Sequence, residues 1–183
     1  MSKTPQLTTR RLSIVPFSER FLTPQYVEWL NDPEVVRFST QRHRVHTLES
    51  CRGYWRSYAG TPNHFWAIVE HEQGLGHIGN MNANIDLHDQ VADLGIIVGN
   101  KIAWRQGYAR EAWLAACKYL FMQAGIRKIT AGTCASNASM VGLMNAAGMI
   151  EDGRRVRQTL IEGCEVDIIH AALFRDSWNP PAG

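Results

Sequence analysis

The sequence of 183 residues has little of three things: long apolar runs, an excess of one charge, and cysteines that stand close together. Its apolar runs fall short of the roughly 20 residues of a membrane-spanning helix, and residues 1–11 are too polar to predict a signal peptide. The 19 Lys and Arg nearly balance the 17 Asp and Glu, so the net charge of +2 gives no basis for a nucleic-acid or membrane partner. The four cysteines form no Cys-x-x-Cys pair and no Cys/His cluster, which predicts reduced thiols, no bound metal and a cytoplasmic location.

The composition that remains suits one globular domain, with 45% hydrophobic and 20% charged residues. No repeat, low-complexity stretch or linker divides the chain. We therefore expect a single domain over 1–183, with a folded core over 9–175 and a flexible tail over 176–183.

The hydrophobic pattern changes its period several times, which predicts a succession of strands and helices. We expect strands over 12–15, 64–70, 76–83, 92–98, 126–133, 154–160 and 165–174, and helices over 25–30, 47–58, 109–121 and 136–147. Thr47 is the expected N-cap of the second helix, while Gly125 and Gly148 are expected to end the last two. This order indicates a mixed α/β (α+β) fold around one central sheet.

The chain contains a literal G-x-G-x-x-G over Gly74–Gly79. A dinucleotide-binding loop of this pattern must lead directly into a helix, so that the first helical amides face the diphosphate. Residues 80–85 alternate instead and are poor helix formers. The pattern therefore predicts a hairpin turn.

A second glycine loop, Trp104–Ala112, lies after the most apolar strand and opens the clearest amphipathic helix. The first amides of a helix lack intrahelical acceptors and carry partial positive charge. Gly107 lets a diphosphate approach the backbone, and Arg105 and Arg110 add cationic donors. The residues alone leave two interpretations open: an anion-binding loop, or an ordinary loop with a surface arginine pair.

Four blocks in this order resemble the GNAT superfamily of acyl-CoA N-acyltransferases: Trp29–Val35, Asp93–Val98, Trp104–Ala112, and Asn137 followed by Gly148-Met149. The first block is similar to the RimJ/RimL-like branch. The resemblance covers nearly the whole chain and implies a mixed, mostly antiparallel sheet with helices on both faces. It also implies that the fourth strand, 92–98, splays from the fifth, 126–133.

The resemblance further implies acetyl-CoA as cosubstrate and no metal. The pantetheine arm would pair with the backbone of Ile96, Ile97 and Val98, in the manner of an added strand. The diphosphate would rest on the amides of Arg105, Gln106, Gly107, Tyr108, Ala109 and Arg110. Asn137 would contact the cofactor from the far side. A homodimer is common among similar proteins.

Two positions depart from the family pattern. Arg105 stands where glycine is common, so it must avoid positive φ, tolerate strain, or offer its guanidinium to a phosphate. Met144 stands where many members carry a tyrosine proposed to protonate the leaving thiolate. Because a thioether donates no proton, another group or water does so, the thiolate leaves unaided, or activity is lost.

An amine must lose a proton before it attacks a thioester at neutral pH. Asp93 matches the acidic residue that often precedes the Leu-Gly of this strand in the family, and it is our candidate base; a solvated carboxylate near a turn is the alternative. Backbone N–H near Ile97 or Val98 would hold the carbonyl oxygen of the intermediate. Glu111 is expected to favour the helix N-terminus rather than to transfer protons.

The candidate acceptor-binding residues are Trp29, Arg37, Phe38, Asn82 and Asn84. The alternating asparagines could bind a polyhydroxyl ligand or simply form a solvated sheet face. The basic clusters 41–44 and 154–157 likewise indicate either solvated charge or attraction to a phosphate-bearing acceptor.

The resemblance, together with these residues, implies direct acetyl transfer from acetyl-CoA to a primary amine. The expected acceptor is a small molecule such as a nucleotide-linked amino sugar. Two alternatives stay open, namely acetylation of a protein N-terminal α-amine, as in ribosomal-protein acetyltransferases, and a non-catalytic acyl-CoA-binding module, which the substitution at Met144 keeps in view.

Overall fold

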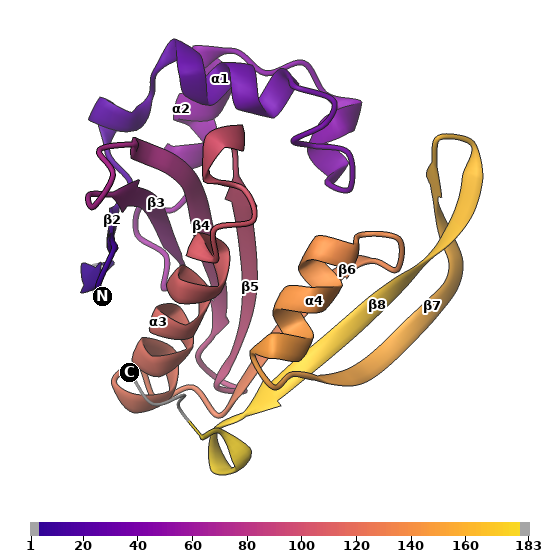
Figure 1. The fold of residues 1–183 in the computed structure, drawn as a ribbon. Helices are drawn as coiled ribbons and strands as arrows, with labels where there is room; N and C mark the ends of the chain where they lie inside the picture. The colour runs from indigo at the N-terminus through magenta and orange to yellow at the C-terminus, as the bar shows by residue number, and fades with distance from the viewer. Residues whose placement is uncertain (1–3, 180–183) are drawn as a thin grey trace.

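One eight-stranded sheet runs through residues 4–179, the part of the chain that the computed structural model describes (Figure 1). The strand order is β1-β2-β3-β4-β5-β6-β8-β7, and every neighbouring pair is antiparallel except β5 and β6. The strands are β1 Leu7–Thr8, β2 Leu12–Pro16, β3 His64–Glu70, β4 Gly76–Asp86, β5 Val91–Val98, β6 Lys128–Cys134, β7 Ile150–Ile161 and β8 Cys164–Phe174. The α-helices are α1 Pro24–Asn31, α2 Leu48–Arg56, α3 Tyr108–Met122 and α4 Ala138–Ala146. This single, mostly antiparallel mixed sheet confirms the predicted fold class.

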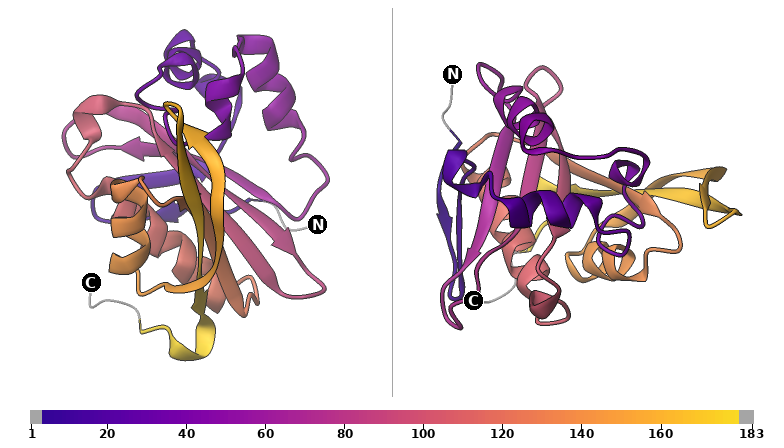
Figure 2. Two further views of the ribbon diagram at one scale, coloured as in Figure 1. Left: turned by 90° about the vertical axis from the view of Figure 1, so that its right-hand side faces the viewer. Right: turned by 90° about the horizontal axis from the view of Figure 1, so that it is seen from above.

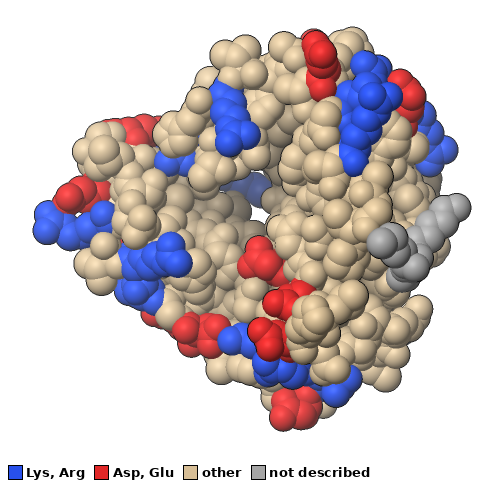
Figure 3. Space-filling view, turned by 180° about the vertical axis from the view of Figure 1, so that it is seen from behind, with Lys and Arg blue, Asp and Glu red and all other residues tan. Residues whose placement is uncertain are grey.

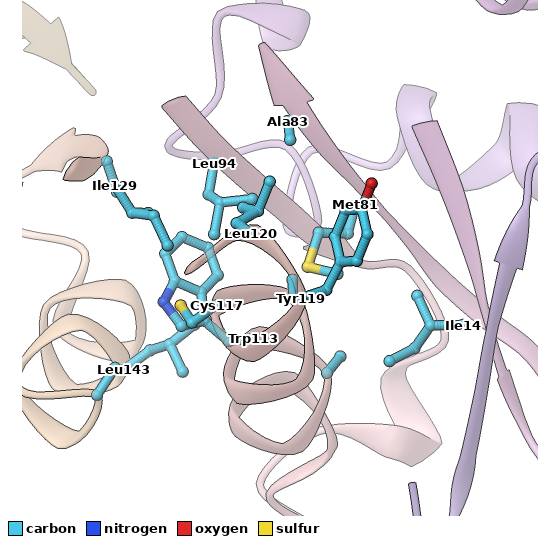
Figure 4. Packing of buried hydrophobic residues seen from close by; sticks show 14 of the residues in the cluster. Ile14, Met81, Ala83, Leu94, Trp113, Cys117, Tyr119, Leu120, Ile129 and Leu143 are labelled. Carbon is cyan, nitrogen blue, oxygen red and sulfur yellow. The ribbon is translucent and has the colours of Figure 1, made fainter. Parts of the chain in front are cut away.

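Helices cover both faces of the sheet, as predicted. Successive side chains of a strand point to opposite faces, and on β3 Trp66 and Ile68 pack into the α3 cluster while Phe65 and Ala67 pack into the α1–α2 cluster. On the α3 side, the fully buried Trp113 packs with residues of the sheet and of α4 (Figure 4). The sheet is therefore sandwiched between two apolar layers, which fix the positions of its strand ends.

The central strands β5 and β6 part soon after they meet. Their pairing covers only Val91–Asp93 against 128–130. Beyond Thr130, β6 continues along β8, while the rest of β5 is paired only with β4. The divergence is visible in Figure 1 and confirms the predicted splay between these two strands.

The sequence signals for helix ends are confirmed. Thr47 Oγ1 accepts from Ser50 N, and Ser50 Oγ accepts from Thr47 N, which together form a capping box before α2. Gly125 and Gly148 follow α3 and α4 with φ of +73° and +80°, a conformation that glycine adopts with little strain.

The last hairpin begins earlier than predicted, at Ile150 rather than at residue 154. Its pairing slips twice, between Glu151 and Gly153 and between Arg155 and Thr159. Because β7 is an exposed edge strand with register shifts, it lacks the alternation that marks a half-buried strand in sequence.

Folded structure also extends past both limits expected for the core. The Trp66 indole donates to the Pro5 carbonyl at 2.8 Å, before residue 9. After residue 175, the Trp178 ring lies 5.3 Å from the Phe121 ring, centroid to centroid. The expected flexible tail thus begins with packed structure, and its last four residues, 180–183, lie outside the described part of the chain.

The G-x-G-x-x-G segment forms part of the β3–β4 turn and the start of β4, as predicted. The carboxylate of Glu70, which is 1% exposed, accepts hydrogen bonds from the amides of Glu72, Gln73 and Leu75 at 2.6, 2.7 and 2.9 Å. These amides form a small anion-binding concavity that the chain fills with its own carboxylate. These three amides of the turn are therefore not free to bind a dinucleotide.

We expect Glu70→Gln to lower the free energy of unfolding by about 1–3 kcal/mol at pH 7, because the carboxylate loses charge-assisted hydrogen bonds. Burial raises the pKa of Glu70, but the backbone donors outweigh it and hold that pKa below its ordinary value. The stabilisation is thus present above the unfolded pKa and lost as the pH falls through the folded one. Urea unfolding at pH 7 and at successively more acidic pH measures this; a difference between wild type and variant that does not shrink toward acid would contradict it.

Candidate active site

Within residues 4–179, no strand pairs beyond Asp93 with the edge of β5 that faces β6. In an antiparallel pair, alternate residues direct their backbone groups away from the partner strand. Gly99 N bonds to Ile78 O at 3.0 Å, whereas the carbonyl of Val98 faces away from β4 and accepts from Trp104 Nε1 at 2.8 Å. The backbone groups of Ile96, two residues from Val98, therefore face the opening.

Ile97 belongs to the other set of residues. Its backbone faces β4, and its side chain packs against the α1–α2 cluster. Of the three residues predicted to pair with a pantetheine arm, Ile96 offers both backbone groups and Val98 only its N–H, because the Val98 carbonyl is already engaged. The backbone groups of Ile97 do not face the opening, because those of successive residues in a strand point to opposite edges.

The opening is a hollow in the molecular surface. Seen from behind, a deep depression lies near the centre of the molecule, with Asp and Glu side chains along its lower rim (Figure 3). The segment after α1 reaches across toward the β7–β8 hairpin (Figure 2, right). Arg37 Nη2 donates to Glu162 Oε2 at 2.9 Å, and Arg42 Nη2 donates to Thr159 Oγ1 at 3.1 Å.

These contacts place two of the predicted acceptor residues. Arg37 is exposed, and its guanidinium is engaged with Glu162. The ring of Phe38 lies beneath it, 5.2 Å from Arg37 Cζ, and the Phe38 carbonyl accepts from Cys134 Sγ at 3.8 Å. The segment thus bridges the two halves of the sheet and narrows the hollow.

The loop before α3 presents a row of free amides. Arg105 and Gly107 have φ of 60° and 81°, and Gly107 is the N-cap of α3 without any side-chain cap. Within residues 4–179, the amides from Arg105 to Arg110 donate no hydrogen bond. Consecutive unpaired amides at a helix N-terminus form an anion site. The six predicted loop residues thus present consecutive unpaired amides, and Arg105 adopts the positive φ.

Glu111 has a structural role, as expected. Its carboxylate accepts from Thr9 Oγ1 at 2.6 Å, from Arg11 N at 2.9 Å and from Arg11 Nε at 2.7 Å. Burial raises the pKa of Glu111, but these hydrogen bonds and the charge of Arg11 hold it below its ordinary value. The group is therefore a poor proton carrier near neutral pH.

Asn137 and Met144 both belong to α4. Asn137 Oδ1 accepts from Met140 N at 3.2 Å, and Nδ2 donates to Thr133 Oγ1 at 3.0 Å. Asn137 thus caps the helix, and both side-chain groups are engaged. Met144 is 2% exposed inside the core, so its thioether lies away from the opening.

Asp93 lies where the β5–β6 pairing ends. Thr130 Oγ1 donates to Asp93 Oδ2 at 2.8 Å. Asp93 is exposed, yet desolvation by neighbouring groups raises the pKa of its carboxyl above the ordinary value, against the lowering effects of the Thr130 hydrogen bond and of the His170 charge. A carboxylate with a raised pKa beside a hollow is a candidate general base.

His170 of β8 is a further candidate site residue, which the sequence analysis missed, because its charge acts on the Asp93 carboxyl. It pairs with Gly132, whose missing side chain leaves room for the imidazole: a Cβ at Gly132 would lie 3.2 Å from His170 Nδ1. His170 Nε2 is buried, and no described group bonds to it. The one available signal was a polar residue inside an apolar strand.

The three asparagines of β4 share the face of Asp93 but differ in exposure. Asn80 is buried and its Oδ1 lies 3.1 Å from His77 Nε2. Asn82 leans over β5, where a Cβ at Gly95 would meet its Oδ1 at 2.6 Å. Asn84 is exposed and pairs in register with Asp93. Asn82 and Asn84 thus lie on the same face of the sheet as the candidate base Asp93.

Trp29 is a core residue rather than an exposed contact. It is 7% exposed, and its ring lies against Gly99, where a Cβ would fall 2.1 Å from Trp29 Cδ2. The His77 ring packs on it at 5.0 Å between centroids. The space above Gly99 thus lets the indole pack into the core, and a role for Trp29 in acceptor binding stays a prediction.

The basic cluster of the last hairpin is largely neutralised within the fold. Arg154 pairs with Glu151 and Asp167 at 3.0 Å each, and Arg157 pairs with Glu165. This favours the interpretation of solvated, internally paired charge over an open phosphate site.

Among residues 4–179, no group of three or more His, Cys, Asp and Glu is placed to hold a metal ion. In the same range, no helix combines the length and apolar character needed to cross a membrane. All four cysteines are free.

Comparison with known proteins agrees with this geometry. Residues 11–150 match the acetyltransferase (GNAT) domain family. A search of curated proteins finds no match. Three solved structures illustrate the similarity of fold. Spermidine N-acetyltransferase from Vibrio cholerae, in complex with CoA and spermine, gives a TM-score of 0.81 at 16% identity and covers 92% of this chain and 98% of its own.

An acetyltransferase of the GNAT family from Bacillus anthracis has a TM-score of 0.80 at 20% identity, and the match covers 94% of this chain and 100% of that one. RimL, a ribosomal L7/L12 alpha-N-protein acetyltransferase in complex with CoA, has a TM-score of 0.81 at 13% identity, and the match covers 93% of this chain and 98% of that one. These identities show a shared fold, whereas the domain match covers most of the sequence. The chain belongs to the GNAT acetyltransferase family, whose cosubstrate is acetyl-CoA.

Proposed function

We propose that this protein transfers the acetyl group of acetyl-CoA directly to a primary amine of a small molecule. One observation carries the proposal: unpaired amides over Arg105–Arg110 and the free edge of β5 lie on either side of Trp104, with Asp93 further along that edge. A diphosphate fits the amides, and an extended amide-bearing chain fits the strand edge. Acetyl-CoA contains both groups, joined in this order to a thioester.

The chemistry needs three groups. The amine nitrogen would attack the thioester carbonyl carbon, and Asp93 would accept the proton that the nitrogen loses, directly or through water. The N–H groups of Ile96 and Val98 both face the opening; one of them would stabilise the developing oxyanion, and the other would pair with the pantetheine arm. The carbon–sulfur bond then breaks. Because a thiol has an ordinary pKa near 8.5, its thiolate can leave without a dedicated acid, which accommodates Met144.

The acceptor is proposed to be a small, hydroxyl-bearing amine, such as a nucleotide-linked amino sugar. Asn82 and Asn84 offer amide donors and acceptors beside Asp93, which suits hydroxyl groups. The bridge from Arg37 to Glu162 limits the width of the hollow. For an attached phosphate, Arg44 of the basic cluster 41–44 is a cation that forms no ion pair with any described residue.

A second acceptor class is a protein N-terminal α-amine. The similarity of fold to RimL favours this class. The spermidine enzyme has the same TM-score, so fold similarity favours a small polyamine acceptor equally. Fold similarity thus leaves the acceptor to be decided by chemistry at Asn82, Asn84 and His170. A binding module without turnover is the remaining alternative.

An amine panel tests the proposal. Thiol release from acetyl-CoA is followed with free and nucleotide-linked amino sugars, spermidine, and peptides with free N-termini, and mass spectrometry identifies each product. We expect turnover with a small amine and a mass gain of one acetyl group on its nitrogen. Acetylation of peptide N-termini alone would replace the small-molecule acceptor. Tight CoA binding without any turnover would support the binding module instead.

A further inference from the structure

Arg11, at the start of the chain, touches the amide-rich loop at several points. Its Nη1 donates to the Gln106 carbonyl at 3.0 Å, and its Nε donates to Glu111 Oε2 at 2.7 Å. Its guanidinium carbon lies 4.4 Å above the centre of the Tyr108 ring. The side chain is only 20% exposed, so these contacts are shielded from water.

We infer that Arg11 is a positioning residue for CoA: it holds the loop Arg105–Arg110 in its anion-binding shape before the ligand arrives. This inference rests on the proposed function of that loop. Arg11 does not itself react, and it lies on β2's flank, 95 residues before Gln106 in sequence. No sequence pattern within the loop contains it.

The first reason is conformational. The loop has two residues at positive φ, Arg105 and Gly107. Glycine adopts this conformation freely, but in Arg105 it persists only where surrounding contacts determine it. Gln106 lies between them, and its carbonyl must point away from the concavity if the neighbouring amides are to point into it. Arg11 Nη1 holds that carbonyl on the outer side.

The second reason is electrostatic. Glu111 lies in the first turn of α3, where its negative charge would oppose a bound diphosphate. The carboxylate is turned to Arg11 and Thr9, which satisfy it with three hydrogen bonds. The helix N-terminus therefore keeps its positive character for an external anion. A loop shaped in advance loses less entropy when the ligand binds.

Lysine should not replace this arginine. The planar guanidinium bonds to a backbone carbonyl and a carboxylate at once, and it stacks on the Tyr108 ring. A single ammonium on a flexible stem lacks this fork. The neighbouring Arg10 provides a matched control, because it is 81% exposed and forms only a 3.8 Å ion pair with Glu72.

The test is the affinity for CoA, measured by calorimetry on the full chain. We expect the dissociation constant to rise about tenfold in Arg11→Lys and further in Arg11→Met, and to stay within about twofold of wild type in Arg10→Met. With an amine that the panel identifies, KM for acetyl-CoA should rise in the same proportion, while kcat at saturation changes little. This split separates positioning from a loss of folded protein.

Gly125→Ala controls for stability, because it strains a positive φ at the far end of α3 with no neighbour within 4 Å of the new Cβ. This variant should lower the melting temperature without weakening the binding of CoA. Arg11 variants that fold and bind CoA as tightly as wild type would overturn this inference alone. A wild-type protein that does not bind CoA would overturn the proposed function and this inference together.

Discussion

Replacing Asp93 by Asn is expected to lower kcat at neutral pH by between about 100-fold and 10,000-fold, the range typical for loss of a general base. The affinity for CoA should stay near that of wild type, because the diphosphate loop begins at Arg105, twelve positions further along the chain. Asparagine keeps the size of the side chain and a hydrogen bond to Thr130. The change therefore removes the proton acceptor with little disturbance of the fold.

The pH–rate profile gives a sharper readout than the rate alone. Desolvation by neighbouring groups raises the pKa of Asp93, so the wild-type rate should fall toward acid at a pH above the ordinary range of an aspartate. The sign follows from the role, since only the unprotonated carboxylate accepts a proton. Asp93→Asn should lose this acid limb. Asp89→Asn, in the exposed turn before β5, is the matched control, and an unaltered profile in Asp93→Asn would remove Asp93 from the mechanism.

Gly107→Val should weaken CoA binding by at least about 100-fold. Gly107 has φ of 81°, and a left-handed conformation costs an ordinary residue about 1–2 kcal/mol, more for a β-branched one. A Cβ there would meet only Arg11 Nη2, at 3.5 Å, so conformation rather than crowding is the cause. As the loop relaxes, its amides lose several charge-assisted hydrogen bonds to the diphosphate. Calorimetry with CoA measures the loss.

Gly125→Val separates this effect from general instability. Gly125 also has a positive φ, of 73°, but it follows the other end of α3. We expect both variants to have a lower melting temperature than wild type, and only Gly107→Val to lose affinity for CoA. Equal affinity in the two variants would show that the loop is not the diphosphate site.

The features that could be predicted from sequence depend on neighbours along the chain. The capping box at Thr47, the glycine breaks at Gly125 and Gly148, and the strand His64–Glu70 each follow from a local pattern. The prediction that Gly74–Gly79 forms a hairpin turn is also confirmed, and the structure adds a reason why this turn binds no dinucleotide: the Glu70 carboxylate accepts hydrogen bonds from three of its amides.

What the sequence could not predict depends on contacts between distant segments. Trp29 is buried because Gly99, seventy residues later, leaves space for its ring. The three asparagines of β4 follow one sequence pattern but lie in different environments, because Asn80 contacts His77 whereas Asn82 leans over Gly95. Arg11 and Glu111 meet across a hundred residues. Such pairings follow from the sheet order, which no local periodicity encodes.

The most direct test of the central claim is a titration of isotope-labelled protein with CoA, followed by the shifts of backbone amide resonances. The account predicts that the largest shifts fall on the amides of Arg105–Arg110, with a second group at Ile96 and Val98 on the free edge of β5. Shifts concentrated elsewhere, with the resonances of this loop unchanged at saturation, would contradict it.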